Sequence, residues 1–298
     1  MLLQMERKLK KIYRDSQKDI EKRIKEFAEE AEKTEKKYLA DIETIKKQVR
    51  DGKRTDMALR KAKAEYEAWR EEYLIGSEHW EEMRKVIASE MLNVNKTAVA
   101  YINGKLPQVY ALNYNAIGDQ TSGIAGFSFE LVDASTVRNL AKSNKTLLPY
   151  KKVDGKKVIR WNTKKVNSQI MQGIIQGDSI PNIAKRLYEN VPEMELASAV
   201  RNARTAVTSA ENKGRMDSYH DAEKMGLILQ KQWIATHDGR TRPEHLELDG
   251  IIEEVDEPFV NGYGEIMYPG DPDADPGNVY NCRCALASII VGFSKNGK

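Results

Sequence analysis

The sequence predicts an α+β protein in which helices predominate and a small β-containing domain lies near the C-terminus. Three observations support this prediction. The first 100 residues contain no proline, and their only glycines are Gly52 and Gly76, so almost nothing there interrupts a helix. Glycine, proline and asparagine become frequent after residue 100. In the last quarter, runs of strand-forming residues alternate with Asp-Gly and Pro-Gly turns.

The N-terminal region is predicted to be a long helical hairpin. Its apolar residues recur mostly three, four or seven positions apart, as expected for one stripe of a helix. They are Leu9, Ile12, Tyr13, Ile20, Ile24, Phe27, Ala31, Tyr38, Ile42, Ile45 and Val49. The segment 50–56 indicates a turn, with Thr55 or Asp56 capping a second helix. The hairpin is expected to dock on a third helix from Ser77, its N-cap, through Asn93.

Residues 101–137 lose the helical pattern, and short apolar pieces at 109–112 and 127–132 are expected to be strands or brief helices. The next segment, 138–165, holds ten Lys and Arg residues and a single acid, Asp154. Asp154 is followed by glycine between alternating flanks, which predicts a β-hairpin. Its arms would present five cations to a DNA partner: Lys151, Lys152, Lys156, Lys157 and Arg160.

A mostly helical region then leads into the C-terminal domain. The expected elements are helices over 163–175, 178–187, 193–214 and, after a break, 217–226, then strands over 227–234 and 285–291 that pair with each other. Three regions follow from these changes of pattern. They are an N-terminal helical region over 1–100 that docks on a partner, a mixed basic connector over 101–160, and a C-terminal domain over 161–298.

Composition and charge argue against a membrane-spanning protein and against a secreted protein stabilised by disulfides. Charged residues make up 31% of the 298-residue chain, mean hydropathy is −0.63, and no apolar run reaches membrane-spanning length. The N-terminus lacks the apolar core of a signal peptide, and two cysteines do not make a disulfide framework, so a reducing compartment is expected. Net charge is +6 over residues 1–70, +9 over 138–165 and −11 over 243–278. Such separation favours a polyanionic partner for the basic surfaces, although solvated charged faces give the same pattern.

The residues that suggest chemistry lie near the C-terminus. The stretch Trp-Ile-Ala-Thr-His-Asp-Gly-Arg-Thr-Arg-Pro-Glu-His occupies positions 233–245, and Asn-Cys-Arg-Cys follows at 281–284. Both cysteines and two of the four histidines therefore fall within these two segments. Upstream, Arg201 and Arg204 share a predicted helix face, with Thr208 and Asn212 further along it. We interpret this polar stripe as an intramolecular clamp, with a phosphate contact as the alternative.

Three interpretations of the Cys–His group remain open. Cys282, Cys284 and His245 could bind a structural zinc ion with His237 or Asp238 as the fourth ligand, although the Cys-x-x-Cys spacing of a standard finger is absent. Alternatively, one cysteine could be a nucleophile with His245 as its base. The third interpretation, which we favour, is a clasp of hydrogen bonds and salt bridges around buried cysteines that pins the long loop between two strands.

In this combination, the C-terminal residues resemble the phage Mu F-like minor head protein family, also called phage head morphogenesis or minor capsid proteins. The resemblance covers roughly residues 160–290. It rests on Arg201, Arg204, Thr205, Trp233, Asp238, Arg240, Thr241, Arg242, His245, Gly250, Asn281, Cys282, Arg283 and Cys284.

The resemblance implies a protein of the virion of a tailed phage, located in the head interior and present in the host cytoplasm during assembly. It also implies association with the portal protein and other capsid proteins, a role in capsid assembly, DNA packaging or DNA delivery, and no catalytic activity. The basic segments suit non-specific binding to double-stranded DNA. No membrane partner is expected, and structural zinc is the only cofactor that the residues suggest. The alternative function is a metal-dependent nuclease or toxin-related enzyme built on the His/Asp/Cys cluster.

Overall fold

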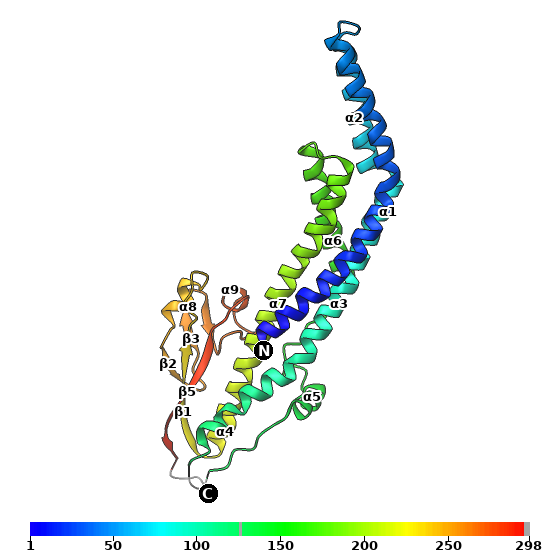
Figure 1. The fold of residues 1–298 in the computed structure, drawn as a ribbon. Coiled ribbons are helices and arrows are strands. Elements are labelled where there is room, and N and C mark those ends of the chain that lie inside the picture. Colours follow the sequence, from blue (N-terminus) through cyan, green and yellow to red (C-terminus); the bar gives the residue numbers. More distant parts are fainter. Residues whose placement is uncertain (125–126, 295–298) are drawn as a thin grey trace. The chain divides into compact units, whose positions relative to one another are not determined.

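The computed structural model describes residues 1–124 and 127–294, and its elements are labelled in chain order in Figure 1. Helices predominate and a small antiparallel sheet lies near the C-terminus, which confirms the predicted α+β class. The chain forms two compact units that are discontinuous in sequence. Unit 1 comprises residues 1–8, 99–152 and the chain from 198 onward, and unit 2 comprises 9–98 and 153–197.

The predicted helical hairpin is present in unit 2. Helix α1 (Leu2–Arg50) and helix α2 (Asp56–Glu71) are joined by a short turn and run antiparallel, since Tyr38 stacks on Trp69 with 5.1 Å between ring centroids. A π-helical turn, η1 (Glu72–Gly76), leads into α3 (Glu78–Tyr114). As predicted, the Ser77 hydroxyl caps α3, accepting a hydrogen bond of 3.4 Å from the Trp80 N–H.

Two buried charges from the hairpin hold the turn between α6 (Gly155–Ile175) and α7 (Ile180–Lys224). The Glu35 carboxylate accepts hydrogen bonds from the Ile180 N–H at 3.1 Å and from the Tyr66 hydroxyl at 2.7 Å. The Arg70 guanidinium donates to the carbonyls of Ile174 and Asp178 at 3.0 and 3.1 Å. An acid thus lies at a helix N-terminus and a base at a helix C-terminus, where the backbone has unsatisfied groups and partial charges of opposite sign.

The predicted β-hairpin around Asp154 is wrong. Asp154 is the N-cap of α6 instead, with its Oδ1 accepting a hydrogen bond of 3.1 Å from the Lys157 N–H. Aspartate before a glycine suits a helix start as well as a hairpin turn. The helical pattern of the segment decides between them, because Asn162, Val166 and Ile170, four residues apart, are all buried.

Two helices are longer than predicted. Helix α3 does not end near Asn93 but continues through Gly104 and Pro107, because a stripe of buried residues persists along it: Ala98, Ile102, Leu106 and Val109. Helix α7 is unbroken at Gly214, where an added Cβ would lie 2.6 Å from the Tyr110 carbonyl oxygen of α3. This glycine permits close helix packing and does not end the helix. The predicted domain bounds at 100 and 160 fall inside α3 and α6.

Two short helices, α4 (Ala116–Thr121) and α5 (Ala134–Ser143), follow α3 in unit 1. The predicted strand or helix over 127–132 is absent, because this segment is irregular. The Asn115 side chain fixes this segment without any β-sheet pairing. Its amide donates to the Val132 carbonyl and accepts from the Val132 N–H, both at 2.9 Å. A single side chain thus replaces regular backbone pairing at this position.

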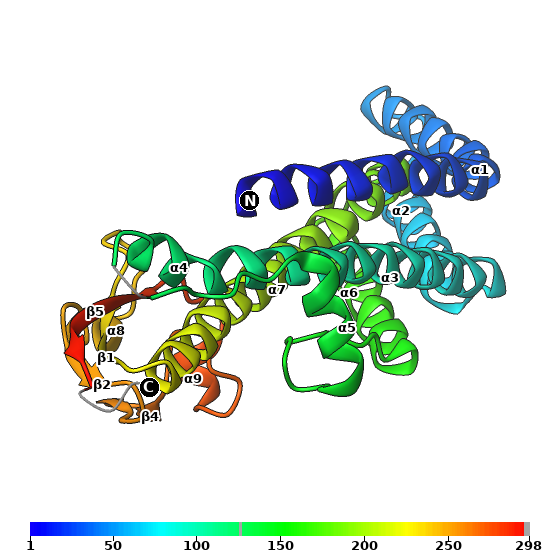
Figure 2. The same ribbon diagram turned by 90° about the horizontal axis from the view of Figure 1, so that it is seen from below.

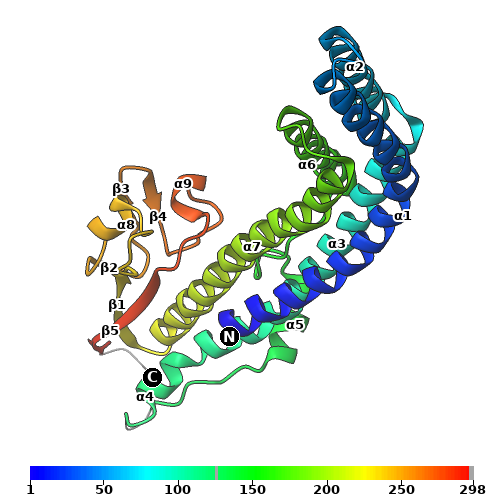
Figure 3. The same ribbon diagram turned by 45° about the horizontal axis from the view of Figure 1, so that its top comes forward.

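The sheet of unit 1 has the strand order β2–β1–β5 and is antiparallel throughout. Strand β1 (Leu227–Ile234) lies between β2 (Ile252–Glu254) and β5 (Ala285–Phe293), which confirms the predicted pairing of the two longer strands. The loops carry α8 (Pro243–Glu247), the hairpin of β3 (Phe259–Asn261) and β4 (Gly264–Ile266), and α9 (Pro276–Val279). Figures 2 and 3 show these elements beside the C-terminal part of α7.

Trp233 belongs to the hydrophobic core of this region. Its fully buried ring meets Phe259 and His245 edge-on, with centroid distances of 5.3 and 5.4 Å. Lys231 is also buried, and its ammonium donates to the Val255 carbonyl at 2.9 Å. Burial lowers the pKa of Lys231 to about 8. Among the described helices, none combines the length and apolar character needed to cross a bilayer.

Candidate functional site

One face of α7 binds the backbone that carries the two cysteines. Three polar residues on this face, spaced three and four apart, point at residues 281–286. The Thr205 hydroxyl accepts a hydrogen bond of 2.9 Å from the Asn281 N–H, and the Thr208 hydroxyl donates to the Cys282 carbonyl at 2.8 Å. Asn281 has a φ of 59°, in the left-handed region that asparagine adopts more readily than most residues.

Asn212 makes the most extensive set of these contacts. Its amide nitrogen donates to the carbonyls of Pro269 at 3.0 Å and Cys284 at 3.3 Å. Its amide oxygen accepts from the Leu286 N–H at 2.8 Å. The side chain is fully buried, so no water replaces these bonds. Asn212 thus joins α7, the acidic loop and the first residues of β5, as expected of an intramolecular clamp.

The two arginines of the predicted stripe behave differently. Arg204 donates to the Asn281 side chain at 3.1 Å and pairs with Glu6 at 2.8 Å. Arg201 is exposed and contacts the Ser198 hydroxyl at 3.1 Å, so it lies outside the clamp. Of the two arginines, the structure therefore brings only Arg204 to the Asn-Cys-Arg-Cys segment.

The turn after β1 is fixed by an ion pair between Asp238 and Arg283. One nitrogen of the guanidinium donates to Asp238 Oδ1 at 2.7 Å and a second donates to Oδ2. Hydrogen bonding from Arg283 holds the pKa of the Asp238 carboxyl well below its usual range. The pair links the turn directly to the cysteine segment.

Backbone contacts reinforce that link. The Thr236 hydroxyl donates to the Arg283 carbonyl at 2.8 Å, and the Thr241 hydroxyl donates to the Thr236 carbonyl. Arg242 donates to the Tyr280 carbonyl. Arg240 is exposed and lies 3.5 Å from Asp238, so it adds an outer contact to the ion pair.

A second turn, at Asp249 and Gly250, closes the other side of this loop. Asp249 accepts from the Ala235 N–H at 2.7 Å and contacts His237 Nε2 at 2.6 Å, and both contacts lower the pKa of its carboxyl. Gly250 has a φ of 81° and donates to the Trp233 carbonyl at 2.8 Å. His237 is thus directed to this outer turn, away from the cysteines.

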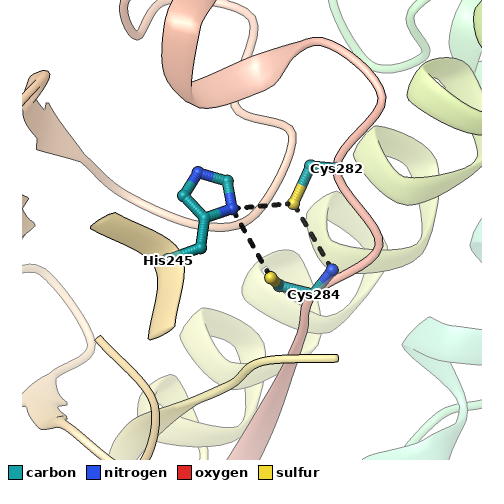
Figure 4. A group of neighbouring side chains, drawn as sticks. All are labelled: His245, Cys282 and Cys284. Atoms are coloured by element: carbon teal, nitrogen blue, oxygen red, sulfur yellow. Dashed lines mark hydrogen bonds between the residues drawn. The ribbon is translucent and has the colours of Figure 1, made fainter. Parts of the chain in front are cut away.

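His245, Cys282 and Cys284 form a compact buried group (Figure 4). His245 Nδ1 lies 3.6 Å from each sulfur, and the Cys284 N–H donates to Cys282 Sγ at 3.4 Å. Hydrogen bonding from Cys282, reinforced by His245, lowers the pKa of the Cys284 thiol, while the same contact and burial raise the pKa of the Cys282 thiol. Neither His237 nor Asp238, the predicted fourth ligands, belongs to this group. Both sulfurs are buried, which disfavours the nucleophile interpretation because a substrate could not reach them.

We call the structure formed by residues 235–250 and 281–286 with the facing side chains of α7 the clasp.

The sequence did not reveal the part played by Gly270 in the acidic loop. Gly270 has a φ of 83°, and an added Cβ would lie 2.8 Å from the Ser209 nitrogen of α7. The Pro-Gly-Asp sequence signalled a turn, but the close approach to α7 required the structure.

The basic side chains of 151–160 do not lie on one ribbon. The Lys151 ammonium bonds to the Asn202 side chain at 2.8 Å, and burial lowers its pKa. Lys152 is exposed before α6, and Lys156, Lys157 and Arg160 are exposed on its first turns. Helical spacing adds Lys164, which was not among the predicted DNA contacts, in line with Lys156 and Arg160.

The part of the chain that contains the clasp resembles a known family. Residues 164–287 match the model for phage Mu protein F like protein. Over 209 residues the chain is 31% identical to the minor head protein GP7 of Bacillus phage SPP1, covering 66% of this chain and 64% of that protein.

A second relative carries a different name. The chain is 28% identical over 226 residues to NAD(+)–arginine ADP-ribosyltransferase EFV of Enterococcus faecalis (strain ATCC 700802 / V583). The match covers 72% of this chain and 43% of that protein, so the chain spans less than two thirds of either relative. No solved structure gives a significant match.

Proposed function

We propose that this chain is a minor head protein, or minor capsid protein, of a tailed bacteriophage and acts in head morphogenesis. One observation carries the proposal. The family match runs from α6 to the start of β5 and so includes the whole clasp, and the relative from phage SPP1 is named as a minor head protein. The proposed location is the head interior of the virion, with the host cytoplasm as the site of assembly.

The proposed partners are the portal protein and other capsid proteins, contacted through the end of the helical hairpin. None of the side chains from 39 to 65 is buried, although this segment carries apolar residues of the hairpin stripe, among them Ile42, Ile45 and Leu59. A helical stripe that is only partly covered within its own unit can complete its burial in an apolar groove or against a helix of a partner.

Co-purification tests this contact. The portal protein is expected to co-purify with the full chain, and the triple variant Ile42→Glu, Ile45→Glu, Leu59→Glu should abolish it. A matched triple change at exposed polar positions outside this segment, Lys18→Glu, Lys22→Glu, Lys33→Glu, should retain most of it. Equal retention by the two variants would contradict docking through the hairpin end. Circular dichroism of both variants would show whether the hairpin remains helical.

The α6 stripe is the proposed contact for packaged DNA. Lys156, Arg160 and Lys164 are exposed at i, i+4 and i+8, and none makes an ion pair within the part of the chain that the structure describes. Such a row suits phosphates along a duplex and supplies binding that is independent of sequence and sensitive to salt. Lys152 and Lys157 extend the charge, whereas Lys151 contributes least because Asn202 holds its ammonium.

A gel-shift titration against salt tests the DNA contact. The variant Lys156→Glu, Arg160→Glu, Lys164→Glu should lose retention at low salt, and the slope of log affinity against log salt should fall by about 0.9 for each phosphate contact removed. The control reverses three exposed cations elsewhere, Lys185, Arg201 and Lys224, and should keep most of the binding. Unchanged retention in the α6 variant would contradict the proposal.

An enzyme is the second candidate, because one relative is named as an ADP-ribosyltransferase. That activity belongs to the relative, of which this chain spans 43%. A metal-dependent nuclease or toxin-related enzyme would need the His/Asp/Cys residues to converge. The structure directs His237 to Asp249 and Asp238 to Arg283. Plasmid nicking, or NAD⁺ consumption, that is lost in a His245→Ala variant would replace the proposed role with an enzymatic one.

A further inference from the structure

We propose that His245, Cys282 and Cys284 bind one zinc ion, which fastens α8 to the segment leading into β5. The three ligand atoms are His245 Nδ1 and the two Sγ atoms, and they lie within 4.8 Å of one another. In Figure 4 both sulfurs face the same ring nitrogen. Two thiolates and an imidazole are the ligand types that zinc prefers.

The two nitrogen–sulfur distances match a metal site. With Zn–S near 2.3 Å and Zn–N near 2.0–2.1 Å, tetrahedral geometry separates an imidazole nitrogen from a thiolate sulfur by about 3.6 Å. Both Nδ1–Sγ distances are 3.6 Å in the structure. A single ring nitrogen cannot donate one proton to two sulfurs in good geometry, whereas its lone pair and both thiolates can converge on one cation.

The surroundings also fit a closed metal site. His245, Cys282 and Cys284 are 1%, 2% and 3% exposed, so water competes little for the ligands. The Cys284 N–H donates to Cys282 Sγ at 3.4 Å, and this hydrogen bond offsets part of the thiolate charge. Trp233 packs edge-on against the imidazole and helps to fix the ring orientation.

Three protein ligands leave one tetrahedral position. Within the described residues no further His, Cys, Asp or Glu joins the group, so a single water molecule enclosed with the ion takes the fourth position in this assignment. The ion displaces the thiol protons and bridges residues 37 and 39 positions apart in sequence. Its role is to hold the clasp together, and it would do so whether or not the protein acts in head assembly.

Metal analysis of the full chain, purified without chelator, tests the site. The expected result is one zinc per chain and, after exchange, a cobalt spectrum with a thiolate-to-metal charge-transfer band and intense tetrahedral d–d bands. Chelation should lower the Tm of unit 1, and added zinc should restore it. Substoichiometric zinc together with no thiolate band on adding cobalt would overturn the proposal without any variant.

Variants locate the ligands. His245→Ala and Cys282→Ser should each weaken cobalt binding by roughly 100-fold or more, since even an outer-shell partner is worth 10–100-fold. His237→Ala removes a histidine that is bonded to Asp249 and lies outside the group, so it should bind cobalt like the unmodified chain. Equal binding by His245→Ala and His237→Ala would overturn the assignment. Rapid reaction of both cysteines with a thiol reagent in the zinc-treated native protein would also overturn the assignment.

Discussion

Replacing Asn212 with alanine is the most informative perturbation of the clasp. The change leaves the Leu286 N–H and the Pro269 carbonyl, bonded at 2.8 and 3.0 Å, without partners in a fully buried position. An unsatisfied buried backbone group costs about 1–3 kcal/mol, so the two together predict a loss of roughly 2–6 kcal/mol of unfolding free energy. The weaker contact to Cys284 and the vacated volume move the value toward the upper part of this range.

Native-state hydrogen exchange is the suitable assay, because a chain with two compact units need not unfold in one step. Amides of β1 and β5 should lose protection in Asn212→Ala, while amides of α2 in unit 2 should keep it. Asn202→Ala, an exposed asparagine on the same helix, is the control and should change stability by no more than about 0.5 kcal/mol. If the β5 amides exchanged at the same rates in the two variants, the proposed clamping role of Asn212 would be refuted.

Two further predictions concern packing and pH. Gly214→Ala should destabilise unit 1 despite the better helix propensity of alanine, because its Cβ would meet the Tyr110 carbonyl; Gly104→Ala, with no atom within 4 Å, should stabilise it by up to about 1 kcal/mol in urea titrations. Lys231 has a folded pKa of about 8, below its usual value, so the unfolded chain binds more protons above pH 8. Unfolding free energy should therefore rise from pH 8 toward 10 by roughly 1 kcal/mol per pH unit relative to Lys231→Met. Parallel pH profiles for the two proteins would contradict a lowered pKa of Lys231.

The sequence predicted the elements whose signals are local and unopposed. The apolar stripe of α1, the turn before α2 and the Ser77 cap follow from spacing and capping chemistry alone. Strands β1 and β5 were predicted together with their pairing, since both are rich in strand formers and a long polar loop joins them.

The wrong predictions involve residues that are compatible with two different local structures. Asp154 with Gly155 suits a hairpin turn or a helix start, and only the burial of α6 residues decides for the helix. Gly214 and Pro107 suggest helix ends, but tertiary packing carries α7 and α3 through them. Local sequence contains neither the approach of Tyr110 to Gly214 nor the stripe that continues along α3.

The candidate site was predictable in its members but less so in its contacts. The Asn-Cys-Arg-Cys segment, His245 and Asp238 were identified from residue type and spacing, and the structure joins Asp238 to Arg283 and His245 to both cysteines. His237 contacts Asp249, 12 positions later in the sequence, and Lys151 contacts Asn202, 51 positions later. No local sequence signal predicts either contact.

We propose that the clasp is an architectural module needed to build a phage head. The most direct measurement counts particles made in host cells with and without this chain, by yield, packaged genome content and infectivity. Particles lacking the chain should be defective in at least one of the three, and Asn212→Ala should reproduce the defect while Asn202→Ala should not. Particles that are normal by all three measures without the chain would contradict the proposal.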